Sequence, residues 1–147
     1  MIRVPLIVRY PGMIPSDRTS EAMQSLVQLA PTMLSFLDLP IPKTMTGVDQ
    51  REVWCNERSK ARDHIICENH HQPTTVHLKT YVDERYKITV YYNREYGELF
   101  DLKEDPNEIN NLWDDPEYKD LKSELLLKFL WAEMGKEPMW MPRLWGA

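Results

Sequence analysis

The fold is decided by a stretch in the middle of the chain, Thr74-Thr-Val-His-Leu-Lys-Thr-Tyr-Val-Asp-Glu-Arg-Tyr-Lys-Ile-Thr-Val-Tyr-Tyr-Asn93. Its segments 74–81 and 85–93 are rich in β-branched and aromatic side chains, which are typical of strands. The residues between them, 82–84, have the length of a hairpin connection. Two similar segments, 64–68 and 98–102, lie on either side, the second after a short connection at 94–97. Together the four segments predict an antiparallel meander.

A helix is predicted after the fourth strand. Asp114-Asp-Pro116 combines a capping carboxylate with a proline at the first helical position, which is a typical helix start. Apolar residues then recur at helical spacing as far as Gly135: Tyr118, Leu121, Leu125, Phe129 and Ala132. We expect this stripe to pack on one face of the meander, which gives an α+β fold: an antiparallel four-stranded sheet packed on a C-terminal helix.

The first part of the chain has a different character. Val4-Pro-Leu-Ile-Val8 is continuously apolar, as in a parallel strand that is covered on both faces and therefore needs neighbours. Ser25 and Gln28 fit a capping box for a helix that runs to about Asp38, with a kink at Pro31. Residues 44–63 show no clear period, and we interpret them as a connection between two structural layers.

Composition excludes several classes of protein. The chain has 147 residues, 18 basic and 23 acidic side chains and a formal charge of -5, so it offers no basic surface for nucleic acid or for an anionic membrane. No stretch approaches the ~18 apolar residues of a membrane span. The apolar run within residues 1–10 is broken by Pro5 and ended by Arg9, so it is too short for the apolar region of a signal peptide. We expect a soluble protein whose localisation is unknown. Residues 136–147 are apolar enough to be docked on something.

Histidines are the candidates for acid–base or anion-binding chemistry because only they titrate near neutral pH. His70 and His71 fall in a predicted turn, 69–73, where they either donate hydrogen bonds to an anionic ligand or simply face water. His77 lies in the second predicted strand, where a packed or surface role is favoured. No H-x-x-x-H spacing supports a metal site.

Other reactive motifs are missing from the sequence. It has no G-x-S-x-G elbow, and neither Cys55 nor Cys67 has a base fixed beside it by local sequence. The acidic run from Asp101 to Glu108 lacks the ligand spacing of a calcium loop, which favours a solvated turn. The residues alone therefore predict a fold and no catalytic group.

Several motifs, taken in order, are similar to the sulfatase family. They cover the chain from Ile2 to about Leu130: Arg3-Val-Pro-Leu-Ile-Val-Arg-Tyr-Pro-Gly12, Leu29-Ala-Pro-Thr-Met-Leu34, Gly97-Glu-Leu-Phe-Asp-Leu-Lys-Glu-Asp-Pro106 and Asn110-Asn-Leu112. The resemblance is to the C-terminal portion of that alkaline-phosphatase-like family. It implies that residues 1–50 are the terminal strand and helix of a larger α/β domain, and that residues 51–147 are the C-terminal subdomain.

The resemblance also implies hydrolysis of sulfate esters in the complete enzyme. That chemistry uses a formylglycine made within C-x-P-S-R and a divalent cation, usually calcium. Cys55 is followed by Asn-Glu-Arg-Ser and Cys67 by Glu-Asn-His-His, so neither fits the motif. We therefore expect no catalytic residue, metal ligand or cofactor in this chain. Family subdomains of this kind often line the substrate cleft, which makes His70, His71 and His77 candidate substrate contacts.

The resulting prediction is a C-terminal sulfatase fragment that is inactive alone. Its partners would be the N-terminal sulfatase domain and, in the complete enzyme, a sulfated small molecule or glycan. The strand at 4–8 would be left without its sheet, so we expect the isolated chain either to self-associate through it or to leave residues 1–40 disordered. The alternative is a free-standing binding or interaction module derived from the same subdomain.

Overall fold

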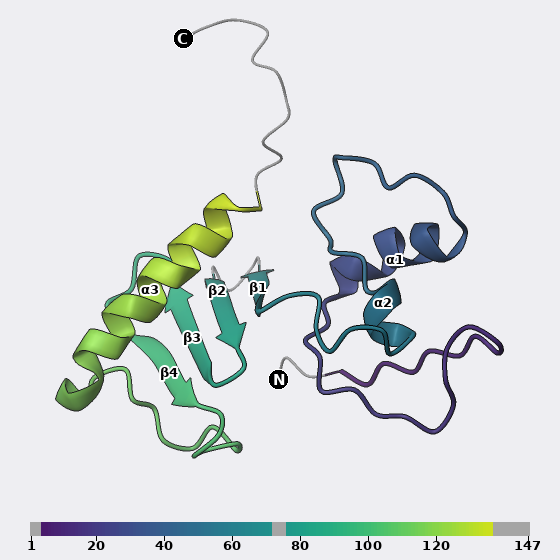
Figure 1. Cartoon of the computed structure of the whole chain (residues 1–147). Helices are drawn as coiled ribbons and strands as arrows, with labels where there is room; N and C mark the ends of the chain where they lie inside the picture. Colours follow the sequence, from purple (N-terminus) through teal and green to yellow (C-terminus); the bar gives the residue numbers. More distant parts are fainter. Residues whose placement is uncertain (1–3, 72–75, 137–147) are drawn as a thin grey trace, which may run out of the picture. The chain divides into compact units, whose positions relative to one another are not determined.

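The computed structural model describes residues 4–71 and 76–136, which form two compact units (Figure 1). One unit is Asp63–Glu133, and the other contains residues 4–62. The expected boundary after residue 50 concerns the domains of a larger protein and stays a prediction, as does the docking of residues 137–147, which lie outside the described part. Among the described residues, no helix has both the length and the apolar character needed to span a membrane.

The unit Asp63–Glu133 contains the predicted meander. Its strands are β1 (His64–His71), β2 (Val76–Asp83), β3 (Tyr86–Tyr91) and β4 (Gly97–Asp101), all antiparallel and in the order β1-β2-β3-β4. The register places Ile66, Tyr81, Ile88 and Leu99 side by side across the sheet. The prediction of a four-stranded antiparallel sheet is therefore confirmed.

Strand β1 is longer than the sequence indicated. His70 and His71 were expected in a turn, but both belong to β1, where they pair with His77 and Val76 respectively. Backbone pairing with β2 is continuous along all eight residues of β1, so the strand continues beyond its apolar part. The side chains at this end are polar, so a prediction based on hydrophobicity does not recognise it as part of the strand.

The C-terminal helix forms where it was predicted. A single turn, η2 (Pro116–Tyr118), leads into α3 (Lys119–Met134). The side chain of Asp115 caps this start by accepting a hydrogen bond of 2.9 Å from the backbone N–H of Glu117. In Figure 1, α3 lies against the sheet, with its N-terminal end near the loop that follows β4.

The core of this unit lies between α3 and one face of the sheet. It consists of buried residues from both layers: Tyr81, Ile88, Leu99, Leu125, Phe129 and Ala132. Ile88, Leu99 and Leu125 are fully buried at 0% exposure. The helical stripe of the sequence is thus the surface that packs on the meander.

A buried carboxylate fixes the end of β4. Arg85 donates to Oδ2 of Asp101 from Nε at 2.9 Å and from Nη2 at 2.8 Å. The N–H of Lys103 donates to Oδ1 at 3.1 Å. These bonds, led by the Arg85 guanidinium, hold the pKa of the Asp101 carboxyl below its usual value, against the opposing effect of burial. Asp101, at the start of the acidic run, is therefore a structural residue.

Stability should fall in acid partly through Asp101. A carboxyl whose pKa is lower in the folded than in the unfolded state stabilises the fold above its unfolded pKa, about 3.9, and loses that contribution as pH falls through the folded value. We expect Asp101→Asn to reduce the free energy of unfolding by about 1–2 kcal/mol at pH 7. Urea unfolding of both proteins at pH 7, 5 and 3 should show the difference shrinking below about pH 4. A difference that is the same at all three pH values would contradict this assignment.

The unit that contains residues 4–62 is built on the predicted first helix. The chain forms a turn η1 (Leu26–Gln28) and then α1 (Leu29–Phe36), so helical structure ends close to the expected Asp38. The side chain of Gln28 accepts a 2.7 Å hydrogen bond from the N–H of Ser25, the Gln half of the predicted capping box. The change from 3-10 to α geometry at Leu29 lies just before Pro31.

A short helix, α2 (Arg51–Trp54), lies in the stretch that we expected to be a connection. It is tied to α1 through Thr32, whose Oγ1 donates to the carbonyl of Gln28 at 2.6 Å and accepts from the N–H of Gln50 at 3.0 Å. Gln28, Thr32 and Gln50 are all fully buried. This polar network, which has no apolar period, explains why the sequence did not predict α2.

The strand expected at Val4–Val8 is not formed. Residues 4–10 have no regular secondary structure, and Ile7 is 93% exposed. A strand that is covered on both faces needs neighbouring strands for its backbone hydrogen bonds. None of the described residues provides such a neighbour, so the apolar segment stays exposed.

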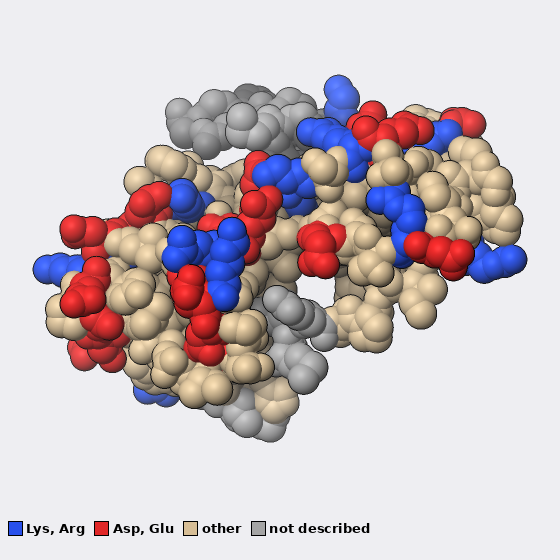
Figure 2. All heavy atoms as spheres, turned by 60° about the horizontal axis from the view of Figure 1, so that its bottom comes forward, with Lys and Arg blue, Asp and Glu red and all other residues tan. Residues whose placement is uncertain are grey.

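Charged side chains on the face drawn in Figure 2 are intermingled, with Lys and Arg lying among Asp and Glu. Among the described residues, ion pairs include Arg85–Asp101, Lys87–Glu108 and Lys128–Glu124. This face therefore presents no basic patch, in line with the formal charge of -5. That the protein does not bind nucleic acid stays a prediction.

Candidate substrate-contact site

Two of the candidate histidines meet where β1 and β2 pair. His70 and His77 are direct cross-strand partners, and their ring centroids lie 3.7 Å apart. The ring of His77 also stacks on that of Tyr92, just beyond β3, with centroids 5.2 Å apart and planes inclined by 27°. The N–H of Tyr92 donates to the carbonyl of His77 at 2.8 Å, which fixes this alignment. His70, His77 and Tyr92 form an aromatic row across three neighbouring segments, which we call the histidine row.

His71 does not belong to this row. Successive side chains of a strand point to opposite faces of the sheet, so His71 projects away from the face that carries His70. His64, at the other end of β1, stacks on the core residue Tyr81 with centroids 5.3 Å apart. The structure thus brings His70 and His77 together, places His71 on the other face and gives His64 a structural contact.

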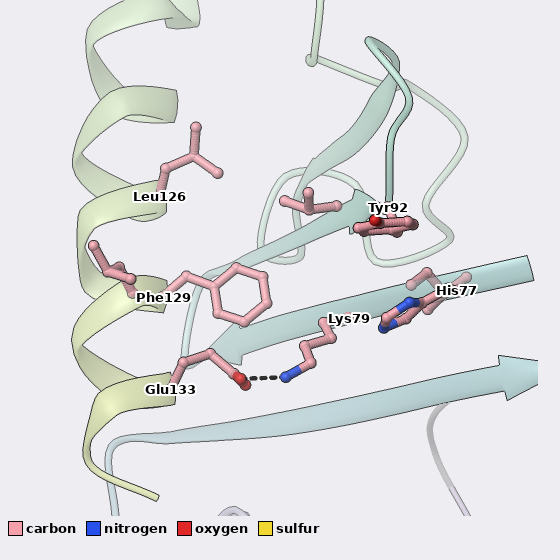
Figure 3. Close-up of a pocket in the computed structure, with 9 residues that line it drawn as sticks. His77, Lys79, Tyr92, Leu126, Phe129 and Glu133 are labelled. Carbon is pink, nitrogen blue, oxygen red and sulfur yellow. Dashed lines mark hydrogen bonds and ion pairs between the residues drawn. The ribbon is translucent and has the colours of Figure 1, made fainter. Parts of the chain in front are cut away.

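A groove lies beside the histidine row, between β2, β3 and the C-terminal half of α3. Its volume is about 360 Å³, and both sheet and helix residues line it: His77, Leu78, Lys79, Val90, Tyr92, Leu126, Phe129, Leu130 and Glu133. Figure 3 shows Leu126, Phe129 and Glu133 of α3 on one side, with Lys79, His77 and Tyr92 along the other. We call this space the α3 groove.

Neither Tyr92 nor the α3 groove was predicted from the sequence. The signal was present in the alternation of the strands: His77, Lys79 and Tyr81 share one face of β2, and Val90 and Tyr92 continue that face on the next strand. Because Tyr81 is a core residue facing α3, every residue in phase with it also lies on the helix side. The distance between α3 and this end of the sheet, which leaves room for the groove, could not be predicted from the sequence.

The polar residues of the groove are linked by charge. The Lys79 ammonium forms an ion pair with Glu133 of α3, drawn as a dashed line in Figure 3, and lies 3.6 Å from a carboxylate oxygen of Glu68 on β1. One positive and two negative groups give this cluster a formal charge of -1. The cluster joins the C-terminal end of α3 to the sheet next to the histidine row.

Neither cysteine has the environment of an activated nucleophile. Burial raises the pKa of the Cys67 thiol, and burial together with Glu57 raises that of Cys55. A raised pKa reduces the thiolate fraction at neutral pH, the reverse of what a reactive cysteine requires. The pKa of Tyr91 is raised as well, to about 12, by burial and by its hydrogen bond of 3.0 Å to Glu98.

The described residues do not fit the cofactors of a sulfatase centre. Within residues 4–71 and 76–136, no three His, Cys, Asp or Glu side chains are grouped so that they could hold a metal ion. Neither cysteine stands in the motif from which formylglycine is made. The calcium and formylglycine implied by the sequence resemblance therefore find no place in this part of the chain.

Comparison with known proteins decides the family. The family profile described as N-sulphoglucosamine sulphohydrolase, C-terminal, matches residues 1–134. This chain belongs to the sulfatase family. Within it, the sulfatase chain corresponds to the C-terminal portion, which confirms the resemblance found in the sequence.

Individual relatives agree with this placement. The sulfatase chain is 32% identical to an N-acetylglucosamine-6-O-sulfatase of Bacteroides thetaiotaomicron over 131 residues, which are 84% of this chain and 24% of that protein. It is 28% identical to an arylsulfatase of Clostridium perfringens, covering 92% of this chain and 28% of the relative. The sulfatase chain thus spans about a quarter of these relatives.

A solved structure supports the fold directly. A protein determined in complex with its substrate D-glucosamine-2-N,6-O-disulfate matches with a TM-score of 0.81 and 27% identity, over 88% of this chain and 28% of that protein. A sheet of four antiparallel strands with a C-terminal helix is therefore the sulfatase C-terminal subdomain. The sulfatase chain is a C-terminal fragment in the sense that it matches only this part of its relatives.

Proposed function

We propose that the enzyme to which this chain belongs hydrolyses a sulfate ester on a sugar, and that the chain contributes one wall of its substrate cleft. The family match supports the reaction class, and similarity to proteins named for N-acetylglucosamine 6-sulfate and D-glucosamine-2-N,6-O-disulfate supports a sulfated amino sugar. The reactive group and the cation would be supplied by the remainder of that enzyme. This chain would bind and orient the substrate.

The observation that carries this proposal is the histidine row. His70 and His77 converge from two strands, and an imidazole N–H can donate a hydrogen bond to a sulfate or a hydroxyl oxygen. Hydrogen bonds that involve an ionised group are about twice as strong as neutral ones. His71, the third candidate, would contact substrate only from the opposite face of β1, so we expect it to contribute less.

Kinetics of the enzyme that carries this chain test the assignment. With N-acetylglucosamine 6-sulfate as substrate, His70→Ala and His77→Ala should each raise KM about tenfold and leave kcat nearly unchanged, as expected for groups that bind substrate and transition state equally. His64→Ala is the matched control, because His64 stacks on Tyr81 at the other end of β1. Unchanged KM in both row variants, or an equal rise in the control, would overturn the proposal.

The isolated chain is expected to self-associate through residues 4–8. Val4, Leu6, Ile7 and Val8 are exposed apolar residues in one segment, and Ile7 is 93% exposed. Such a segment tends to pair with another chain because its apolar side chains and backbone groups lack partners. We expect light scattering to show oligomers that dissociate on dilution. Hydrogen exchange at residues 4–8 should become faster as the oligomers dissociate. A monomer that is protected throughout this segment would contradict the expectation.

A further inference from the structure

The α3 groove has the properties of a small-ligand site. Its volume of about 360 Å³ lies within the roughly 300–1,000 Å³ of such sites, and its lining is mainly apolar with a few polar groups, as is usual for them. Val90, Leu126 and Phe129 form apolar walls. Leu130 and Tyr92 also line the groove although they are 55% and 73% exposed, so apolar surface continues to its rim.

Charge in the groove disfavours an anionic ligand. Among the described residues of the lining, Lys79 is the only Lys or Arg, and it is already engaged by Glu133 and lies close to Glu68. The cluster has a formal charge of -1, so a sulfate group that enters beside Lys79 would find its ammonium already paired and would meet two carboxylates. Like charges repel most strongly where water is partly excluded. The groove is therefore suited to an uncharged group.

The shape of the groove suits a ring. At its rim the stacked rings of His77 and Tyr92 present aromatic surface, and the ring of Phe129 contributes on the α3 side (Figure 3). Aromatic side chains offer large, rigid apolar faces together with a polar group at the tip. His77 belongs both to the groove and to the histidine row. A substrate whose sulfated unit contacts the row would therefore place the group next to that unit at the groove.

We propose that the α3 groove binds an uncharged six-membered ring, the part of the substrate next to the sulfated unit. The proposal rests on the proposed function, because that function places the sulfated unit at the histidine row. A neutral sugar and an aryl group share the relevant chemistry, apolar faces without charge. The groove would thus select the neighbour of the sulfated unit, while the row contacts the unit itself.

Titration of the 147-residue chain, followed by two-dimensional NMR, tests this with three probes. They are methyl N-acetyl-β-D-glucosaminide as a neutral sugar, phenol as an aryl group and N-acetylglucosamine 6-sulfate as the charged counterpart. At least one uncharged probe should shift the backbone amides of Lys79 and Val90 saturably, and the probe that does so identifies the source of the ring. The sulfated sugar should leave these two amides unchanged. Failure of both uncharged probes, or equal binding of the sulfated one, would overturn the proposal.

Two substitutions on α3 provide a matched comparison. Leu130→Glu places a carboxylate in the groove and should weaken binding of the uncharged probe at least about tenfold, because that charge would lose water on binding. Leu127→Glu makes the same change at a residue that is 44% exposed on the same helix and does not line the groove. It should bind like the unchanged chain. Should Leu130→Glu not fold, Tyr92→Ala removes ring surface at a highly exposed residue and should weaken binding in the same direction.

The two proposals fail in different ways. Unchanged KM in His70→Ala and His77→Ala, with normal binding of an uncharged ring at Lys79 and Val90, would refute the histidine contacts and leave the groove assignment intact. Raised KM in both histidine variants, with no binding of either uncharged probe, would refute the groove alone.

Discussion

Leu125→Ala should lower the free energy of unfolding of the sheet-and-helix unit by about 2–5 kcal/mol. Leu125 is fully buried on α3 and packs in the core with Ile88 and Leu99, which are also at 0% exposure. Truncation removes apolar contacts and leaves a cavity that a sheet on one side and a helix on the other can only partly fill. Urea unfolding at constant pH, followed by the circular dichroism of the sheet and helix, measures the loss.

Leu127→Ala is the control for this change. It removes the same atoms from the same helix at a residue that is 44% exposed, so its effect should stay within about 0.5 kcal/mol. Equal losses in the two variants would mean that the stripe of α3 does not form the core. That result would remove the reason for placing the α3 groove between the helix and the sheet.

Gly47→Ala should destabilise the other unit by about 1–3 kcal/mol or more. A Cβ at residue 47 would lie 2.0 Å from the carbonyl oxygen of Val27 and 2.7 Å from its carbonyl carbon. The obstacle is backbone, which cannot rotate away as a side chain can, so the η1–α1 segment would have to shift. Hydrogen exchange of the amides of α1 in the intact chain measures the effect, because it reports on this unit separately.

The control is Gly12→Ala, where an added Cβ would meet nothing within 4 Å but the backbone φ is +85°. This change costs only the conformational strain of a left-handed residue, about 1 kcal/mol, and should not affect the amides of α1. Faster exchange at α1 in Gly12→Ala and none in Gly47→Ala would contradict the proposed close approach.

The sequence predicted those parts of the fold that rest on local signals. The strands around Tyr81 and Ile88 are β-branched and aromatic, and their connections are short, so strand order follows from chain order. The stripe that contains Leu125 and the cap at Asp115 likewise fix α3 within a few residues. Each of these features depends on side chains that are close in sequence.

Features that depend on distant partners were not predictable. Val4–Val8 has the composition of a buried strand, but a strand exists only where other strands pair with it. The helix α2 is held by a hydrogen bond from the buried backbone N–H of Gln50 to the hydroxyl of Thr32, 18 residues away. The sequence around α2 has no apolar pattern that would predict it. The histidines were predicted as candidates, but the row formed by His70, His77 and Tyr92 depends on the register of three segments.

This chain is the C-terminal portion of a sulfatase, and we expect it to contain no nucleophile for sulfate ester hydrolysis. The most direct test is to incubate the purified 147-residue chain with 4-nitrophenyl sulfate and calcium and to follow release of 4-nitrophenol. We predict no turnover above the rate without protein. Turnover by the chain that persists in the double variant Cys55→Ala, Cys67→Ala would contradict the claim, because it would place a catalytic centre among residues to which we assign none.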